Sequence, residues 1–297
     1  MPAVRPFTPS RAALVVAVAS LCFAWSGPLA RLAAPAHPLV IACGRTALAA
    51  LLLTLIAPRA TLSALRDTPP RTLAGIALAG ALLAAHFGFF LAGLAATSLP
   101  AAVTLVSLEP IAVVLTAWVA FRERPRTGEL VGVLLATAGA VVLSRGAGGG
   151  GHRLVGDLLV LLAVAVYGLY LGVARGLSGR VGAASYAALV YAVAAVLLFG
   201  ASFVASASFE LPARGWLFIA ALGIVPTLGG HTLVQWAAGR VPAPVVALVS
   251  PGETIGSLVI AAAFLGERPS AIEAAGAALA LVGVGFTLVA QRARGPS

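Results

Sequence analysis

Ten long apolar segments, separated by short polar breaks, run along this chain of 297 residues. They cover residues 12–32, 38–57, 73–96, 100–120, 127–144, 155–174, 183–206, 214–237, 243–264 and 270–290. A helix that crosses a lipid bilayer needs about 20 predominantly apolar residues. Charged residues make up only 9% of the chain, too few to cover the exterior of a soluble domain of this size. We therefore predict an all-α polytopic membrane protein with ten transmembrane helices.

The second half of the sequence repeats features of the first half at an offset of 144 residues. The pairs at this offset are Glu109 with Glu253, Glu123-Arg124-Pro125 with Glu267-Arg268-Pro269, Glu129 with Glu273, Pro100 with Pro244, Gly132 with Gly276, and Gly139 with Gly283. Six of the nine acidic residues belong to these pairs, which chance does not readily produce. The pattern indicates a duplicated half with a buried carboxylate in each copy.

Five apolar segments per half is an odd number, so the second half must enter the membrane in the inverted orientation. We assign residues 1–145 to the first five-helix repeat and residues 153–297 to the second. Residues 146–152 between them form a glycine-rich linker. The predicted fold is therefore two inverted five-helix repeats.

The arginines indicate how the chain is oriented. The chain has no lysine, so its net charge of +10 comes from arginine alone. With the N-terminus inside, thirteen arginines fall on the cytoplasmic side and five on the outer side, at positions 31, 145, 153, 214 and 268. Cytoplasmic loops carry the excess of positive charge, so we expect an inner (cytoplasmic) membrane protein with both termini cytoplasmic. The arginines form no basic stripe with interleaved aromatics, which argues against a nucleic-acid partner.

The sequence predicts neither a cofactor nor a metal. Cys22 and Cys43 both lie in apolar segments without neighbouring histidines, which indicates neither a metal site nor a disulfide framework. No glycine loop for phosphate and no metal-binding His-Glu helix occurs, so an ATP-driven pump is not expected.

Several motifs carry a resemblance to a known group. The fourth segment of each half is followed by Glu-Arg-Pro, and residues 94–102 (LAATSLPAA) lead into Glu109-Pro110. With two five-helix halves, the chain resembles the EamA branch of the drug/metabolite transporter superfamily over nearly its whole length. The second half departs from the pattern, with Thr254 in the place of Pro110 and Pro251-Gly252 just before it. The resemblance implies a ten-helix secondary transporter, commonly an exporter, with a central cavity between the halves.

Glu109 and Glu253 are the strongest candidates for substrate or proton binding. A carboxylate at mid-bilayer costs about 2.5–3.5 kcal/mol on insertion scales, so it tends to persist where it faces a cavity or a partner. Pro110 frees a backbone carbonyl one turn earlier, and Pro251-Gly252 marks a second helix break beside Glu253. The alternative is a structural role, in which each carboxylate is satisfied by a hydroxyl or backbone group of a neighbouring helix.

Arg45 and His86 are further candidates for substrate or proton binding. Arg45 lies within the second segment and is the only arginine not near a predicted end. It is placed to neutralise Glu109 or to hold an anionic group of a substrate, and snorkelling to the outer surface is the alternative. His86 is central in the third segment, where a satisfied interior histidine and a proton relay are both open interpretations.

Aromatic residues supply candidate lining groups for a cavity. We expect Trp25, His231, Trp236 and Tyr167 to line it, with His231 in the eighth segment corresponding to His86 in the third. Aromatic residues also gather at membrane interfaces, and the sequence does not separate these roles.

The predicted function is secondary-active transport of small metabolites by alternating access. Export of amino-acid-like solutes or drugs and proton coupling are the more specific expectations. The expected partners are a small-molecule substrate and membrane lipid, and a homodimer stays open. We expect no enzymatic activity. The alternatives are a membrane-embedded lipid-modifying enzyme, for which no catalytic cluster is found, and a non-transporting membrane partner protein.

Overall fold

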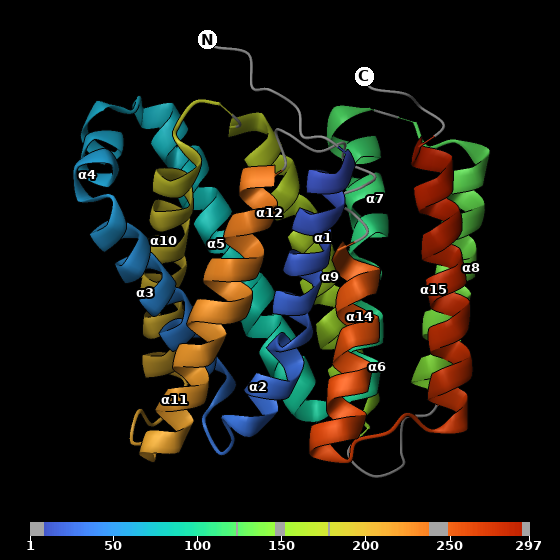
Figure 1. Cartoon of the computed structure of the whole chain (residues 1–297). Helices are drawn as coiled ribbons and strands as arrows, with labels where there is room; N and C mark the ends of the chain where they lie inside the picture. The colour runs from blue at the N-terminus through green and yellow to red at the C-terminus, as the bar shows by residue number, and fades with distance from the viewer. Residues whose placement is uncertain (1–8, 123, 146–151, 178, 238–248, 293–297) are drawn as a thin grey trace.

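The computed structural model describes residues 9–122, 124–145, 152–177, 179–237 and 249–292, and every regular element in these ranges is a helix (Figure 1). The elements are α1 (Pro9–Ala24), α2 (Ser26–Leu32), α3 (Pro38–Ile56), α4 (Pro58–Asp67), α5 (Pro70–Ala96), α6 (Leu99–Val106), α7 (Glu109–Phe121), α8 (Thr127–Ser144), α9 (Leu154–Leu177), α10 (Ala183–Val204), α11 (Ala213–Leu222), η1 (Gly223–His231), α12 (Thr232–Ala237), α14 (Val249–Ile260), η2 (Ala261–Leu265) and α15 (Ala271–Arg292). Helices η1 and η2 are π-helical. The prediction of an all-helical fold is confirmed for the described residues.

Helices long and apolar enough to cross a membrane mark the chain as a multi-pass integral membrane protein. Within the described residues there are 5 of them: Pro38–Ile56, Pro70–Ala96, Leu154–Leu177, Ala183–Val204 and Ala213–Val234. The other predicted spans correspond to interrupted helices or to helices with shorter apolar stretches, so a count of ten stays a prediction. The interruptions fall at Trp25 between α1 and α2, and at residues 107–108 between α6 and α7.

The polar break between the second and third predicted segments contains a short helix, α4. Its Leu62 and Leu65 are exposed, as are Arg59 and Arg66. Charged and apolar side chains therefore share its surface, which suits a helix lying at the boundary between lipid and water. Figure 1 places α4 at one end of the bundle, beside α10.

Helices α8 and α15 form a close pair that shows the internal duplication directly. A Cβ added to Gly139 would meet the backbone oxygen of Gly276 at 2.8 Å, and one added to Gly283 would meet that of Gly132 at 2.7 Å. These two contacts exchange when each residue is replaced by its counterpart 144 residues away. Repeat-related glycines therefore make equivalent contacts across the α8–α15 pair, where glycine allows the two helix backbones to approach this closely.

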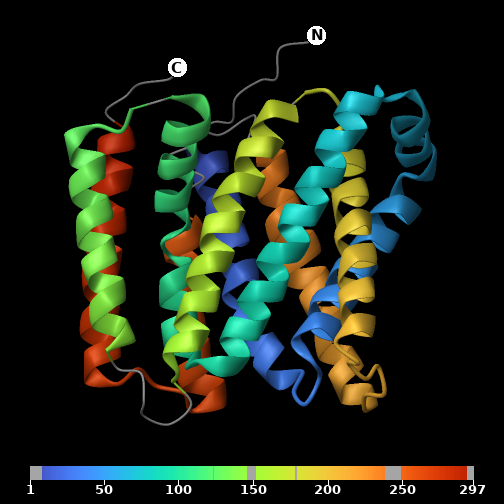
Figure 2. The ribbon, with the colours of Figure 1, turned by 180° about the vertical axis from the view of Figure 1, so that it is seen from behind.

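The two ends of the bundle are distinct. α1 starts and α15 finishes at the same end, where α4 also lies (Figure 1). The opposite end carries the turn between α2 and α3, the start of α6, the start of α9 and the connection from η2 to α15 (Figures 1 and 2). We call this second end the α2–α6 end.

Candidate functional site

The break between α6 and α7 presents backbone carbonyls to the other half of the chain. In an α-helix the N–H of each residue bonds the carbonyl four residues earlier, and proline has no N–H. Pro110 therefore leaves the Val106 carbonyl without its helical donor, and Ser250 Oγ of α14 donates to it at 3.2 Å. Thr254 Oγ1 donates to the Val103 carbonyl at 2.9 Å. Hydroxyls of the second half thus satisfy the irregular backbone of the first.

The contact between α1 and α14 uses the same chemistry. Pro28 leaves the Ala24 carbonyl without its helical donor, and Ser257 Oγ donates to that carbonyl at 2.8 Å. Gly252 lets the helices approach, since a Cβ there would lie 2.5 Å from Ser20 Oγ. The sequence predicted a helix break at Pro251-Gly252, and the described helix runs unbroken from Val249 through Gly252. Residues 238–248 before it lie outside the described residues.

Glu109 starts α7 directly after the break. Helix N-termini present unsatisfied N–H groups and a positive dipole end, which stabilise a negative charge. Ser250 Oγ lies 3.4 Å from Glu109 Oε2, at the long limit of a hydrogen bond. Glu253 lies close enough to Glu109 to interact with it electrostatically, so the repeat-related carboxylates face one region between the halves.

Glu253 is buried in α14, with 7% of its surface exposed. Among the described residues its carboxylate has no hydrogen-bond partner and no cation within ion-pair distance. Arg45 is the cation that acts on Glu253 over a longer distance. A buried carboxylate without direct partners has its binding capacity available for another group.

Arg45 on α3 is fully buried, with 0% of its surface exposed, so it does not snorkel to the membrane surface. Its Nε donates to Thr227 Oγ1 at 2.8 Å and its Nη1 to Ser26 Oγ at 3.3 Å. The guanidinium carbon lies 4.2 Å from the centre of the Phe87 ring, a cation–π contact. Among the described residues Nη2 has no hydrogen-bond partner.

The π-helix η1 places the acceptor for Arg45. Pro226 lies inside η1 and has no N–H, so the α-helical bond from residue 226 to the Leu222 carbonyl is absent. Thr227 Oγ1 donates its proton to Leu222 O at 2.8 Å, so its lone pairs are free to accept from Arg45 Nε. Such π-helical turns occur frequently at functional sites.

The two histidines lie in an aromatic group beside Arg45. His86 Nδ1 is 3.0 Å from the Ala163 carbonyl, and because a carbonyl only accepts, Nδ1 carries the proton of that hydrogen bond. The ring centre of His86 is 4.9 Å from that of Tyr167, and the His231 ring is 5.2 Å from Phe87 and 6.2 Å from Tyr167. The polar groups are thus bordered by aromatic faces.

Electrostatic interactions and hydrogen bonds join these residues into one group, which we call the central cluster. Its members are Arg45, His86, Glu109, Tyr167, Tyr191, Thr227, His231 and Glu253. Tyr191 contributes its hydroxyl, which donates to the Thr227 carbonyl at 3.3 Å. The four predicted binding residues therefore lie together with His231 and Tyr167 from the predicted cavity lining.

The two predicted tryptophans are not placed in the central cluster. Trp25 stands at the break between α1 and α2, and its ring centre lies 5.8 Å from that of Phe264. The side chains of Trp236 and Pro251 lie outside the described residues. Trp236 belongs by its backbone to α12, and Pro251 to the first turn of α14.

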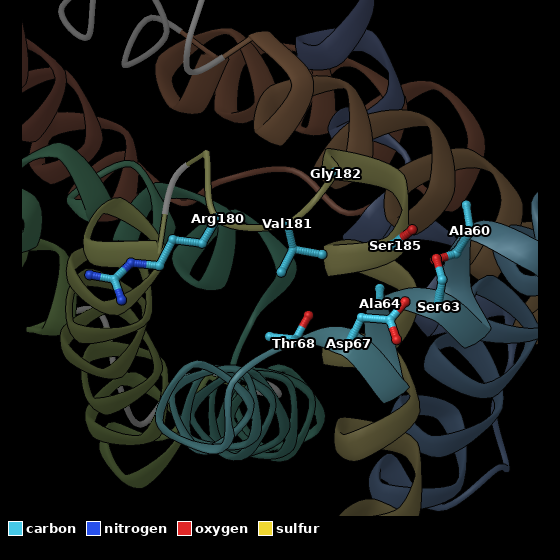
Figure 3. Close-up of a pocket in the computed structure, with 9 residues that line it drawn as sticks. All are labelled: Ala60, Ser63, Ala64, Asp67, Thr68, Arg180, Val181, Gly182 and Ser185. Atoms are coloured by element: carbon cyan, nitrogen blue, oxygen red, sulfur yellow. The ribbon is translucent and has the colours of Figure 1, made fainter. Parts of the chain in front are cut away.

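A surface groove of about 400 Å³ is separate from the central cluster. It lies between α4 and the connection from α9 to α10, and small side chains line most of it (Figure 3). Asp67 and Arg180 are its charged residues, and none of the central-cluster residues lines it.

Comparison with known proteins assigns the family. A model of the EamA-like transporter family matches residues 10–145 and again residues 154–289. The chain belongs to the EamA-like transporter family. This family is part of the drug/metabolite transporter superfamily, so the resemblance found in the sequence is confirmed and the protein is a transmembrane transporter by family.

Other comparisons bear on the fold. A search of curated proteins finds no match to the chain. Among solved structures 24 chains match. One, described only as the crystal structure of a protein, is 21% identical, covers 97% of this chain and 100% of its own, and superposes with a TM-score of 0.71. At that identity the likeness supports the fold of this EamA-like protein alone.

Sequence reasoning missed the hydroxyls of this EamA-like protein that hold the charged groups. Arg45 donates hydrogen bonds to Thr227 and Ser26. Ser250 contacts Glu109. None of these three residues was chosen as a candidate site residue. Thr227 did carry a signal, because Pro226 just before it stands in mid-segment, and a proline there demands a substitute donor. Ser26 and Ser250 carried none, since serine is common in membrane helices.

Proposed function

We propose that this EamA-like protein is a secondary-active transporter that exports small amino-acid-like solutes or related drugs by alternating access. The observation that carries the proposal is the pair Arg45 and Glu253, opposite charges in one buried region between the repeats. Among the ion pairs of the described residues, none joins Arg45 directly to Glu253. Each therefore keeps capacity for a ligand group of opposite charge.

A zwitterion matches this arrangement. Its carboxylate would accept from Arg45 Nη2, the guanidinium nitrogen without a partner. Its ammonium would lie toward Glu253, and the faces of Phe87, His231 and Tyr167 would contact an apolar or aromatic side chain. Transporters bind their cargo near the bilayer midplane at the repeat interface. The central cluster takes residues from α3 and α7 of the first half and from α14 of the second, which supports the same location for the proposed site.

Glu109 is the candidate for proton coupling. It shares its region with Glu253, and two carboxylates in a low dielectric repel one another. A proton or a cationic group that enters between them is therefore stabilised. We propose that Glu109 exchanges a proton with solvent during the cycle while Glu253 faces the substrate.

The proposed topology is ten spans in two inverted repeats, with both termini on the cytoplasmic side of the inner membrane. The shared location of the start of α1 and the end of α15 supports it. Reporter fusions after Ser144 and after Ser297 test it, with an outer and an inner location expected. The same side for both would contradict the inverted repeat.

Counterflow in proteoliposomes tests the transport proposal. Vesicles loaded with unlabelled amino acid should accumulate the labelled form, whereas its methyl ester, which lacks the carboxylate, should exchange poorly. Arg45→Gln should raise the KM for the amino acid at least about tenfold, or about 1.4 kcal/mol, and remove the preference over the ester. Arg59→Gln on the exposed face of α4 is the matched control and should behave like the wild type.

Other outcomes separate the remaining classes. Exchange of drug-like cations with no preference for a carboxylate would favour a drug carrier of the same fold. Absence of counterflow for every solute tested, in protein that is folded and inserted, would favour a lipid-modifying enzyme or a non-transporting partner.

A further inference from the structure

A second buried polar group lies at the α2–α6 end and shares no residue with the central cluster. His152 is 2% exposed, Asp157 is 0% exposed and Glu273 is 5% exposed. His152 Nε2 is 2.8 Å from Asp157 Oδ2, and His152 Nδ1 is 3.0 Å from Glu273 Oε1. The histidine thus stands between carboxylates of α9 and α15.

The imidazole of His152 is held at both ring nitrogens, because each nitrogen faces a carboxylate oxygen. The contact to Asp157 is a hydrogen bond, whereas the Nδ1 contact to Glu273 has ion-pair distance without hydrogen-bond alignment. One ring therefore bridges the buried carboxylates of α9 and α15.

Both carboxylates are also tied to the first half of the chain. Thr97 Oγ1 donates to Asp157 Oδ1 at 2.7 Å, and Ser98 Oγ donates to Glu273 Oε1. Since Thr97 and Ser98 connect α5 to α6, the group joins the start of α9 and the start of α15 to the loop that leads into α6.

An outer ion pair continues the connection. Arg31 at the end of α2 lies 3.3 Å from Glu267 through its Nε, and its Nη2 donates to the Thr97 carbonyl at 2.6 Å. Glu267 also accepts from the Leu99 backbone N–H at 3.1 Å. The α2–α6 end is thus fastened by charge-assisted hydrogen bonds between segments of both repeats.

The repeat does not reproduce this group at the corresponding positions of the first half. The positions 144 residues before His152 and Asp157 are Thr8 and Ala13. Glu129 and Glu123 are the counterparts of Glu273 and Glu267, so these two glutamates are duplicated, whereas the histidine and the aspartate are not. An alternating carrier built from inverted repeats exchanges which end is closed. Contacts that hold only one end closed therefore favour the conformation in which that end is closed.

We propose that the His152 group is a latch that holds the α2–α6 end closed and sets the resting state of the carrier. Opening this end separates the α5–α6 loop from α9 and α15 and breaks the contacts of His152 with its two carboxylates. The latch rests on the proposed alternating-access function.

A distance measurement tests the latch without relying on transport. Nitroxide labels at positions 34 and 268, both exposed at the α2–α6 end, report the separation of the two repeats in purified protein in nanodiscs. Cys22 and Cys43 are first replaced by alanine. The wild type should show mainly the short distance.

His152→Gln keeps roughly the size and one hydrogen bond of the histidine but lacks the second ring nitrogen that faces a carboxylate. It should raise the ratio of open to closed forms at least about tenfold. Arg31→Gln, whose side chain is 26% exposed, tests the outer ion pair with less risk to folding and should raise the ratio more modestly. Arg153→Gln removes an exposed charge beside the histidine and should leave the ratio unchanged.

The outcomes separate the latch from the transport proposal. Distances that do not change in folded His152→Gln and Arg31→Gln proteins would overturn the latch, whatever the transport assay shows. Distances that change as expected in protein that exchanges no solute would keep the latch and refute the proposed function. If Arg153→Gln changed the label distances as much as His152→Gln does, the cause would be surface charge in general, and the latch would likewise be overturned.

Discussion

Thr227→Val is the sharpest test of how the central cluster is built. Valine has nearly the shape of threonine but no hydroxyl, so the change removes two hydrogen bonds and little else. Thr227 Oγ1 donates to the Leu222 carbonyl and accepts from the buried Arg45 guanidinium. After the change, Arg45 keeps only the longer bond to Ser26 among its described hydrogen bonds.

The magnitude follows from these two bonds. A hydrogen bond between neutral groups contributes about 0.5–1.5 kcal/mol and one to a charged group about 1.5–3 kcal/mol. Their combined loss is about 2–4 kcal/mol of stability, which corresponds to a fall in apparent Tm of roughly 5–10 °C for a chain of this size. If Arg45 binds the substrate carboxylate, about half of that energy should also appear in binding, as a roughly tenfold higher KM.

Thermal unfolding in detergent and counterflow in proteoliposomes measure the two effects. Thr137→Val is the matched control, because Thr137 lies exposed on α8 and its hydroxyl bonds only its own helix, at Val133. A Thr227→Val protein with the Tm and KM of this control would refute the argument that η1 positions Arg45. A lower Tm with an unchanged KM would support a structural role for Thr227 and would argue against binding of the substrate by Arg45.

Three further predictions concern other parts of the chain. Glu109→Gln should strongly reduce transport and flatten its dependence on a pH gradient, while Glu253→Gln should be milder; full activity with unchanged pH dependence in Glu109→Gln vesicles would leave Glu109 a structural role. Gly139→Leu should disrupt the α8–α15 pair and lower the yield of folded protein on size-exclusion chromatography, since a Cβ there already meets the Gly276 backbone at 2.8 Å. Lengthening the linker at residues 146–151 by a few glycines should leave counterflow nearly intact, because loop closure costs only about 0.6 kcal/mol per doubling of length, and a large loss of inserted protein would contradict this.

Much of the fold follows from local pattern. Long apolar segments predict membrane helices because backbone groups in lipid must bond within their own helix. The offset of 144 residues predicted which glycines and carboxylates correspond, and Gly139 and Gly283 do make equivalent contacts between α8 and α15. The prediction missed α4, since a ten-residue helix at a surface has no long apolar signal.

The sequence predicted the ionisable residues of the candidate site but not the hydroxyl groups that bind them. Rare ionisable residues inside apolar segments stand out by cost alone, which is how Glu109, Glu253, Arg45 and His86 were chosen. Their surroundings depend on distant parts of the chain: Arg45 and Thr227 are 182 residues apart. No local pattern encodes which of many serines and threonines will face a given charge.

The sequence by itself therefore determined the membrane class, the duplication and the residue types that carry charge, because these depend on composition and spacing. Only the tertiary structure decided that Arg45 is held by hydroxyls of other helices, that Trp25 lies against Phe264, and that His152 joins two carboxylates beside its glycine-rich linker. The physical reason is that helix rotation and crossing set which side chains meet. Those quantities result from packing the whole bundle and are not properties of any one segment.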